Sequence, residues 1–212
     1  MTIHDAQPVY TAGKPLNEAK AAMILVHGRG ASAADIMTLA NELYHEDIAY
    51  FAPEAANSTW YPNSFLNPIR SNEPGISSGI AKIASIVAQI QDEGIPTHKI
   101  IIGGFSQGAC LSSEFVARNP AKYGAVFAFS GGVIGPPGTP RDYPGDLENT
   151  PIFLGCSDVD FHIPKERVQE SADVFRKMGA NVTEKLYPNL GHTINMDEIQ
   201  IAKTILQGVL DA

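Results

Sequence analysis

Residues 104–108, Gly-Phe-Ser-Gln-Gly, constrain the fold of this chain more than any other segment. They follow the apolar run at residues 100–102 and precede a series of small residues, so they lie between a strand and a helix. In this context the pattern Gly-x-Ser-x-Gly is typical of a sharp turn that exposes a serine hydroxyl at the edge of a sheet. Gly104 and Gly108 fit such a turn because strand and helix crowd together there and leave no space for a Cβ atom. We therefore expect Ser106 to be the nucleophile of a serine hydrolase.

Apolar runs typical of buried strands alternate along the chain with segments whose apolar residues recur at helical spacing. This alternation predicts one α/β domain over residues 1–212, with a mostly parallel sheet covered by helices on both faces. Besides the strand and helix that flank Ser106, the expected strands are residues 21–27, 48–52, 125–129, 151–155 and 182–187, and the expected helices are residues 32–46, 78–93, 165–178 and 195–210.

Two stretches interrupt this alternation. Residues 57–77 are rich in Pro, Asn and aromatic residues, and residues 131–150 are rich in Gly and Pro. Loops of this length inside a compact domain are usually functional or disordered. Each follows the carboxyl end of an expected strand, and ligands of open α/β sheets bind at that edge. We therefore expect both stretches to form walls of the substrate site.

The composition argues against several classes of function. Hydrophobic residues make up 44% and charged residues 18% of the chain, which are ordinary globular values. The net charge of −8 argues against nucleic acid or an anionic membrane surface as a partner, because either requires a basic patch. No segment approaches the roughly 18 apolar residues of a membrane span, and residues 1–8 lack the pattern of a secretory signal. We expect Cys110 and Cys156 to be reduced and buried, which favours a cytoplasmic protein.

The sequence indicates neither a metal nor an organic cofactor. The six histidines do not pair with one another or with the cysteines at metal-ligand spacing. The run Gly28-Arg29-Gly30 lacks the third glycine of a dinucleotide-binding fingerprint, and no phosphate-binding loop is present. The expected partner is a small-molecule ester substrate.

A serine nucleophile requires a base, and the base requires an acid that fixes its tautomer. In hydrolases with this turn the partners follow in the chain order serine, acid, histidine. His162 and His192 are the two histidines after Ser106, and we expect His192 to be the base because it lies in a loop between the last expected strand and the last helix. Asp158 and Asp160 both follow a buried strand, and spacing alone does not decide between them.

The oxyanion of an acyl-transfer intermediate needs backbone N–H donors. One is expected from Gln107, which follows the nucleophile, and the other from a loop after an earlier strand. Arg29 occupies that loop, directly after the expected strand at residues 21–27. We expect its guanidinium to be a solvated surface charge, although it could also meet an acidic substrate. His27 is expected to stabilise the loop.

The chain resembles the phospholipase/carboxylesterase family of α/β-hydrolases, which includes acyl-protein thioesterases and small bacterial carboxylesterases. The resemblance implies an α/β-hydrolase fold without a cap domain, and ester or thioester hydrolysis without a cofactor. It also implies that Asp160 is the acid, because the family's aspartate stands three residues before the Val/Ile-Pro pair. The motifs that carry it are His27-Gly28-x-Gly30, Trp60-Tyr61, Gly104-Phe105-Ser106-Gln107-Gly108, Asp160-x-x-Ile163-Pro164 and Gly191-His192.

The chain departs from the family pattern in two places. Members with acyl-protein thioesterase activity usually carry His-Gly-Leu-Gly-Asp and Trp-Phe-Asp, where this chain has His-Gly-Arg-Gly-Ala at residues 27–31 and Trp-Tyr-Pro at residues 60–62. Arg29 replaces the apolar side chain that would line an acyl channel. We therefore expect small to medium esters as substrates, rather than long-chain lipids or palmitoylated proteins. Trp60, Tyr61 and Phe65 are expected to supply an apolar wall of the substrate site.

Several alternatives stay open at this point. The same machinery would serve a lysophospholipase, an acyl thioesterase or an acyl transferase. A non-catalytic α/β-hydrolase fold that binds a small molecule is the alternative of another class. A homodimer is possible, because the long loops carry aromatic residues that could form a contact.

Overall fold

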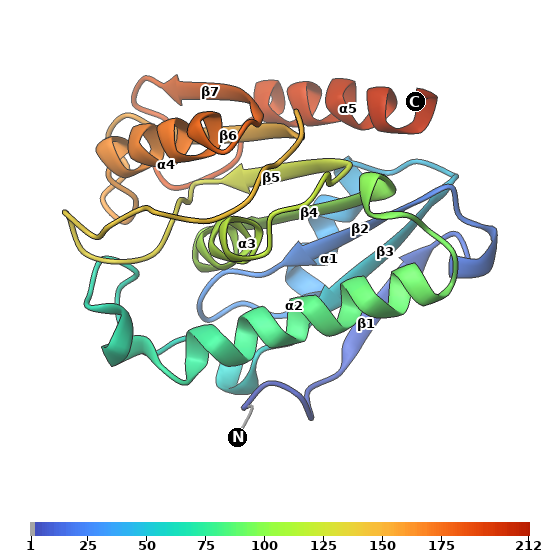
Figure 1. The fold of residues 1–212 in the computed structure, drawn as a ribbon, viewed down its shortest axis with the longest axis horizontal. Helices are drawn as coiled ribbons and strands as arrows, with labels where there is room; N and C mark the ends of the chain where they lie inside the picture. The colour runs from blue at the N-terminus through green and yellow to red at the C-terminus, as the bar shows by residue number, and fades with distance from the viewer. Residues whose placement is uncertain (1–2) are drawn as a thin grey trace.

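The computed structural model describes residues 3–212, in which seven strands form one twisted sheet (Figure 1). The strand order is β1-β3-β2-β4-β5-β6-β7. β1 pairs antiparallel with β3, and every other neighbouring pair is parallel. The strands are β1 (Val9–Gly13), β2 (Ala21–Val26), β3 (Ile48–Pro53), β4 (Ile100–Phe105), β5 (Ala125–Phe129), β6 (Pro151–Ser157) and β7 (Asn181–Tyr187).

Helices cover both faces of this sheet (Figure 1). Residues of α2, α3 and α4 contribute to the hydrophobic core on one face, and residues of α1 and α5 contribute to the core on the other. Among residues 3–212 no separate cap domain covers the sheet, which agrees with the expected fold class. The helices are α1 (Ala33–Glu42), α2 (Gly75–Asp92), α3 (Gln107–Arg118), α4 (Lys165–Lys177) and α5 (Met196–Asp211).

The apolar runs of the sequence are the central strands because both of their faces are covered. All six residues of β2 are buried. Ile24 and Val26 point into one core, and Met23 and Leu25 point into the other. This period of two is the reason that a strand between two helical layers is continuously apolar. β1 is an exposed edge strand that sequence analysis did not predict, since four of its five residues are exposed.

The last helix, α5, begins with a capping pair. The Asn195 side chain accepts hydrogen bonds from the backbone N–H groups of Asp197 and Glu198, and the Glu198 carboxylate accepts one from the N–H of Asn195. α2 begins at Gly75, three residues before the expected start, and α1 ends at Glu42, four residues before the expected end. Cys110 and Cys156 are free and buried.

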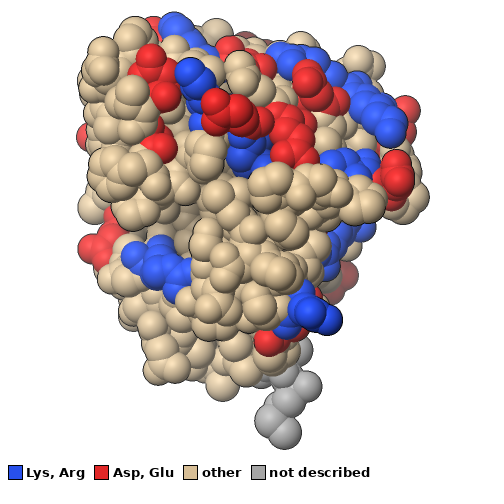
Figure 2. Space-filling view, turned by 90° about the vertical axis from the view of Figure 1, so that its left-hand side faces the viewer, with Lys and Arg blue, Asp and Glu red and all other residues tan. Residues whose placement is uncertain are grey.

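Figure 2 shows the face of the molecule at the carboxyl ends of the strands. Charged side chains gather in the upper part of this face, and its middle part is mostly uncharged. Within residues 3–212 no helix combines the length and apolar character that crossing a membrane requires.

Glu198 is a buried carboxyl group beneath the sheet. Its side chain contacts β6 so closely that a Cβ atom on Gly155 would lie 2.1 Å from Oε1. Oε2 accepts the capping hydrogen bond from Asn195, whereas Oε1 has no hydrogen-bond partner among residues 3–212. Burial raises the pKa of Glu198 to about 7. The nearby charge of Asp197 also raises this pKa, whereas the hydrogen bond from Asn195 lowers it.

We predict that the stability of the wild type falls as pH rises because of Glu198, and that Glu198→Gln abolishes this fall. Between the ordinary glutamate pKa of about 4.3 and the folded-state pKa of about 7, the folded protein retains a proton that the unfolded chain has lost. The free energy of unfolding therefore falls by about 3 kcal/mol across this window. Urea denaturation should show that the stability of the variant relative to wild type increases by about 2–3 kcal/mol from about pH 5 to about pH 8.

Glu166→Gln is the matched control, because Glu166 is an exposed carboxyl in the first turn of α4. It should show no comparable change with pH. A constant difference between Glu198→Gln and wild type across the window would contradict the prediction.

Candidate active site

Ser106 lies at the turn between β4 and α3, in a backbone conformation that non-glycine residues rarely adopt. Its φ is 57° and its ψ is −119°. Such strain persists only where surrounding contacts over-determine the conformation. Here the N–H of Ser106 donates to the carbonyl of Phe129 at 3.0 Å, and its carbonyl accepts from the N–H of Cys110 at 3.0 Å. The turn is therefore fixed between β5 and the first turn of α3.

The two glycines of the motif allow α3 to approach the end of β2. A Cβ atom on Gly108 would lie 2.0 Å from the carbonyl oxygen of Val26, and one on Gly104 would lie 2.6 Å from the same atom. Both distances are far below van der Waals contact, so neither position accepts a larger residue without a shift of the backbone. This is the crowding expected from the sequence.

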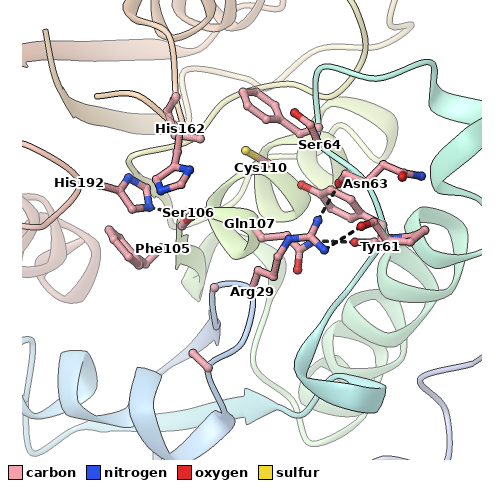
Figure 3. A pocket seen from close by; sticks show the side chains of 15 residues that line it. Arg29, Tyr61, Asn63, Ser64, Phe105, Ser106, Gln107, Cys110, His162 and His192 are labelled. Atoms are coloured by element: carbon pink, nitrogen blue, oxygen red, sulfur yellow. Dashed lines mark hydrogen bonds between the residues drawn. The ribbon is translucent and has the colours of Figure 1, made fainter. Parts of the chain in front are cut away.

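The structure brings Ser106, His192 and Asp160 together from three separate loops. Figure 3 shows the Ser106 and His192 side chains pointing toward each other. Ser106 Oγ lies 2.9 Å from His192 Nε2, and His192 Nδ1 lies 2.6 Å from Asp160 Oδ2. The carboxylate accepts a hydrogen bond from Nδ1–H, which leaves the Nε2 lone pair free to accept from the serine hydroxyl. The imidazole lies between the rings of Phe105 and His162, each with a centroid distance of 4.8 Å.

Asp160 is held as a carboxylate by its surroundings. Its side chain is fully buried, and Oδ1 accepts hydrogen bonds from the N–H groups of His162 at 2.8 Å and Ile163 at 3.0 Å. Burial acts to raise the pKa of Asp160, but the hydrogen bonds from His192 and from the two backbone groups outweigh it, so the pKa lies below its ordinary value. A negative charge therefore stands beside Nδ1 and stabilises a proton there.

Asp158, the other candidate for the acid, serves a different contact. Its Oδ1 accepts from the N–H of Asn189 at 2.9 Å, and Ser157 Oγ accepts from the N–H of Gly191 at 3.1 Å. These two hydrogen bonds attach the loop that carries His192 to the end of β6. The geometry thus distinguishes the two aspartates, which spacing did not.

The loop that follows β2 lies against the serine. A Cβ atom on Gly28 would be 3.4 Å from Ser106 Cβ, and Arg29 and Gln107 both line the cavity in front of Ser106. His27 is fully buried, and its Nε2 accepts from the N–H of Ala55 at 3.1 Å while Nδ1 donates to the carbonyl of Gly28 at 2.7 Å. His27 therefore stabilises the loop, as expected, and the oxyanion role of the Arg29 and Gln107 amides stays a prediction.

A cavity of about 620 Å³ opens beside Ser106. Residues 61–65 form one wall, and His162 and Ile163 form another. The second long stretch, residues 131–150, contributes no lining residue, which corrects the expectation that it borders the site. Its backbone is bound elsewhere: the Glu114 carboxylate accepts from the N–H of Ile134, and the Arg167 guanidinium donates to the carbonyl of Val133. These contacts draw the stretch onto α3 and α4.

Two of the three aromatic residues expected at the substrate wall do line the cavity, namely Tyr61 and Phe65. Trp60 does not, which corrects that part of the expectation. Its side chain is fully buried, and Nε1–H donates to the carbonyl of His27 at 2.9 Å. The indole packs between the imidazoles of His4 and His27, with ring centroids 5.0 and 5.2 Å away. The ring therefore faces the core, where its N–H has a hydrogen-bond partner.

Arg29 also differs from expectation. Its side chain is exposed, but its guanidinium is held by the cavity wall instead of extending freely into solvent (Figure 3). Nη1 donates to Thr59 Oγ1 and to the carbonyl of Pro62, both at 3.0 Å, and Nη2 donates to the carbonyl of Asn63 at 2.6 Å.

Sequence analysis missed the role of the Gln107 side chain. It is buried, and its amide attaches residues 59–61 to the serine turn. Oε1 accepts from the N–H of Trp60 at 2.9 Å, and Nε2 donates to the carbonyl of Tyr61 at 2.8 Å. The motif leaves this position open, so only its amide character could have signalled a paired donor and acceptor. His162 and Cys110 were likewise not predicted to line the cavity.

The mostly parallel sheet with a strained serine at a strand-to-helix turn defines the α/β-hydrolase class. The chain matches the model of the Phospholipase/Carboxylesterase family over residues 11–210. It belongs to that family, which confirms the resemblance inferred from its motifs. The protein is therefore an enzyme, a serine hydrolase of ester or thioester substrates.

Individual relatives agree with this assignment. Acyl-protein thioesterase 1 of Debaryomyces hansenii is 29% identical over 225 residues, which cover 96% of this chain and 97% of that protein. A probable carboxylesterase of Oryza sativa subsp. japonica is 31% identical over 163 residues, 74% of this chain and 60% of that protein. The crystal structure of a phospholipase/carboxylesterase from Dyadobacter fermentans DSM 18053 matches with a TM-score of 0.93 and 42% identity, covering 98% of this chain and 99% of that one.

We predict that Gln107→Leu destabilises the fold. The substitution preserves volume but leaves the N–H of Trp60 and the carbonyl of Tyr61 buried without their side-chain partner. Each lost hydrogen bond of this kind costs about 1–3 kcal/mol, so the loss of two should lower the free energy of unfolding by about 2–6 kcal/mol in urea denaturation. Gln89→Leu, at an exposed position of α2, is the control and should change stability little. Equal stability of the two variants would refute the anchoring role.

Proposed function

We propose that this protein hydrolyses small to medium carboxylic esters through a Ser106-His192-Asp160 triad and a covalent acyl-enzyme. The observation that carries the proposal is the continuous chain of contacts from Ser106 Oγ through both nitrogens of His192 to Asp160, with distances of 2.9 and 2.6 Å. These are the distances at which a base can take the proton of a nucleophile and at which an acid can orient that base.

In the proposed reaction, Ser106 Oγ attacks the ester carbonyl while His192 Nε2 takes the hydroxyl proton. The backbone N–H groups of Arg29 and Gln107 donate to the resulting oxyanion. Collapse of the intermediate breaks the ester C–O bond, and His192 returns its proton to the leaving alkoxide. Water then attacks the acyl-enzyme with His192 as base, which releases the carboxylic acid and restores the serine hydroxyl.

The cavity supports the expected size of the substrate. About 620 Å³ lies within the range of sites for small molecules, and Arg29 stands in its wall where related thioesterases usually have an apolar residue. A second candidate, an acyl thioesterase, is favoured by relatives such as the Debaryomyces hansenii protein. A cytoplasmic location and a homodimer stay predictions.

Substitution of Ser106 should abolish hydrolysis. We expect Ser106→Ala to lower kcat by about 10⁶-fold, because the nucleophile and its base act as a unit. The measurement is hydrolysis of p-nitrophenyl esters from acetyl to palmitoyl, alongside matched thioesters. A peak at short acyl chains supports the proposed substrate class, and a peak at long chains or on thioesters favours the second candidate. Ser85→Ala, on the exposed side of α2, is the control; turnover by Ser106→Ala at the level of this control would exclude the proposal.

The two neighbouring aspartates should differ sharply in their effect on turnover. Asp160→Asn replaces the carboxylate with an amide that no longer favours a proton on Nδ1 of His192, and we expect kcat to fall by about 10⁴-fold. Asp158→Asn keeps an oxygen that accepts from the N–H of Asn189. It should lower kcat by less than about tenfold, because it removes only a charge at a contact with a neutral group. The measurement is kcat of both variants on one p-nitrophenyl ester by steady-state kinetics. A larger loss in Asp158→Asn would reverse the assignment of the acid.

A further inference from the structure

The charged or ionisable groups that line the cavity beside Ser106 are mainly basic, and none is a carboxylate. Of its fifteen lining residues, Arg29 carries the only permanent charge, and none is Asp or Glu. His162 and His192 are the other basic groups in the wall. The chain as a whole has a net charge of −8. A cavity wall with a cation and no carboxylate therefore has a charge opposite to that of the whole chain.

Arg29 lacks the ionic partner that most arginines of this chain have. Among residues 3–212 it forms no salt bridge, whereas Arg118, Arg141, Arg167 and Arg176 each pair with a carboxylate. Its three hydrogen bonds go to neutral oxygens of Thr59, Pro62 and Asn63. The positive charge of Arg29 is therefore not neutralised within the described chain.

The guanidinium is also held in place before any ligand binds. Three of its five N–H groups are bound to the wall, and the head lies 5.9 Å from the centroid of the Tyr61 ring. Nε–H has no acceptor among residues 3–212, and Nη2 uses one of its two N–H groups for Asn63. Nε and Nη2 form the side edge of a guanidinium, which can bind a carboxylate through two hydrogen bonds. Figure 3 places this head across the cavity from Ser106 and His192. A preorganised donor pair loses little entropy on binding.

We infer that Arg29 forms an anion-binding subsite, and that the enzyme prefers esters whose acyl or alcohol part carries a carboxylate group. This inference rests on the proposed function, because it names the class of substrate that the same serine would hydrolyse. The anion would bind the free edge of the guanidinium while the ester carbonyl lies at Ser106. Neutral aliphatic esters would fill the cavity without satisfying these two donors.

The test compares esters that differ only in charge. Monoethyl succinate, glutarate and adipate carry the carboxylate on the acyl part, and 4-acetoxybutanoate carries it on the alcohol part. Each is paired with the neutral ester in which an isopropyl group replaces the carboxylate, and hydrolysis is followed by pH-stat titration. We expect the wild type to favour the anionic member of at least one pair by about 10–100-fold in kcat/KM, the usual range for a charged hydrogen-bonded contact. The pair with the largest ratio identifies which part of the substrate carries the anion.

Arg29→Met should reduce this ratio by about 10–100-fold, whatever it does to the neutral ester. Arg29→Lys, which keeps the charge but not the paired donors, should retain part of the preference. Arg70→Met is the matched control, because Arg70 is exposed, forms no salt bridge among residues 3–212 and lies outside this cavity. It changes the net charge equally and should leave the ratio unaltered. An equal loss on both esters in Arg29→Met would overturn the inference and leave Arg29 as a clamp for residues 59–63.

Binding separates failure of the inference from failure of the proposed function. Calorimetric titration with succinate, glutarate and adipate requires no turnover, and we expect at least one of them to bind the wild type and Ser106→Ala alike and Arg29→Met at least tenfold more weakly. Loss of ester hydrolysis with this binding retained would refute the proposed function alone. Absence of binding to the wild type, or wild-type hydrolysis without preference for charge, would refute the inference alone.

Discussion

The close approach of α3 to the end of β2 is the contact on which the arrangement of the site depends. Gly108 lies so near the Val26 carbonyl that no side chain fits between them, and Gly104, which pairs with Val26 in the sheet, is equally confined. Because the helix begins this close to β2, the loop after that strand must pass directly in front of Ser106. The serine, the expected oxyanion donors and the start of the cavity wall are therefore consequences of a single packing constraint.

Buried polar side chains beneath residues 55–61 fix the conformation of this segment. Gln107, His27 and His4 each pair with backbone groups of this segment. Backbone groups away from water must find partners, and here side chains supply them in place of a regular element. The segment is irregular and yet well packed, and Thr59 within it, with Pro62 and Asn63 directly after it, holds the guanidinium of Arg29 at the edge of the cavity.

Much of this structure could be predicted from local sequence patterns. The apolar runs identified the central strands, and the family motif indicated Asp160, whose carboxylate contacts His192 in the structure, because in each case neighbouring residues carry the pattern. β1 was missed because an edge strand with exposed side chains has no apolar run. The positions of Trp60 and of residues 131–150 depend on partners distant in the chain, such as His27 for the indole and Glu114 and Arg167 for the backbone of the loop. Local patterns do not encode such long-range hydrogen bonds.

The contacts around Asp160 and His192 divide the site into two bodies. Both residues lie in loops that follow the adjacent, hydrogen-bonded strands β6 and β7, and Ser157 and Asp158 tie the loop of His192 to the end of β6. Ser106 and Arg29 follow the ends of β4 and β2, Gln107 begins α3, and β5 lies between β4 and β6 in the sheet. Asp160 and His192 are therefore joined within one part of the sheet, and the 2.9 Å contact between Ser106 and His192 connects that part to the other. Any distortion that slides one part of the sheet against the other would separate Ser106 Oγ from His192 Nε2 while the contact between His192 and Asp160 is kept.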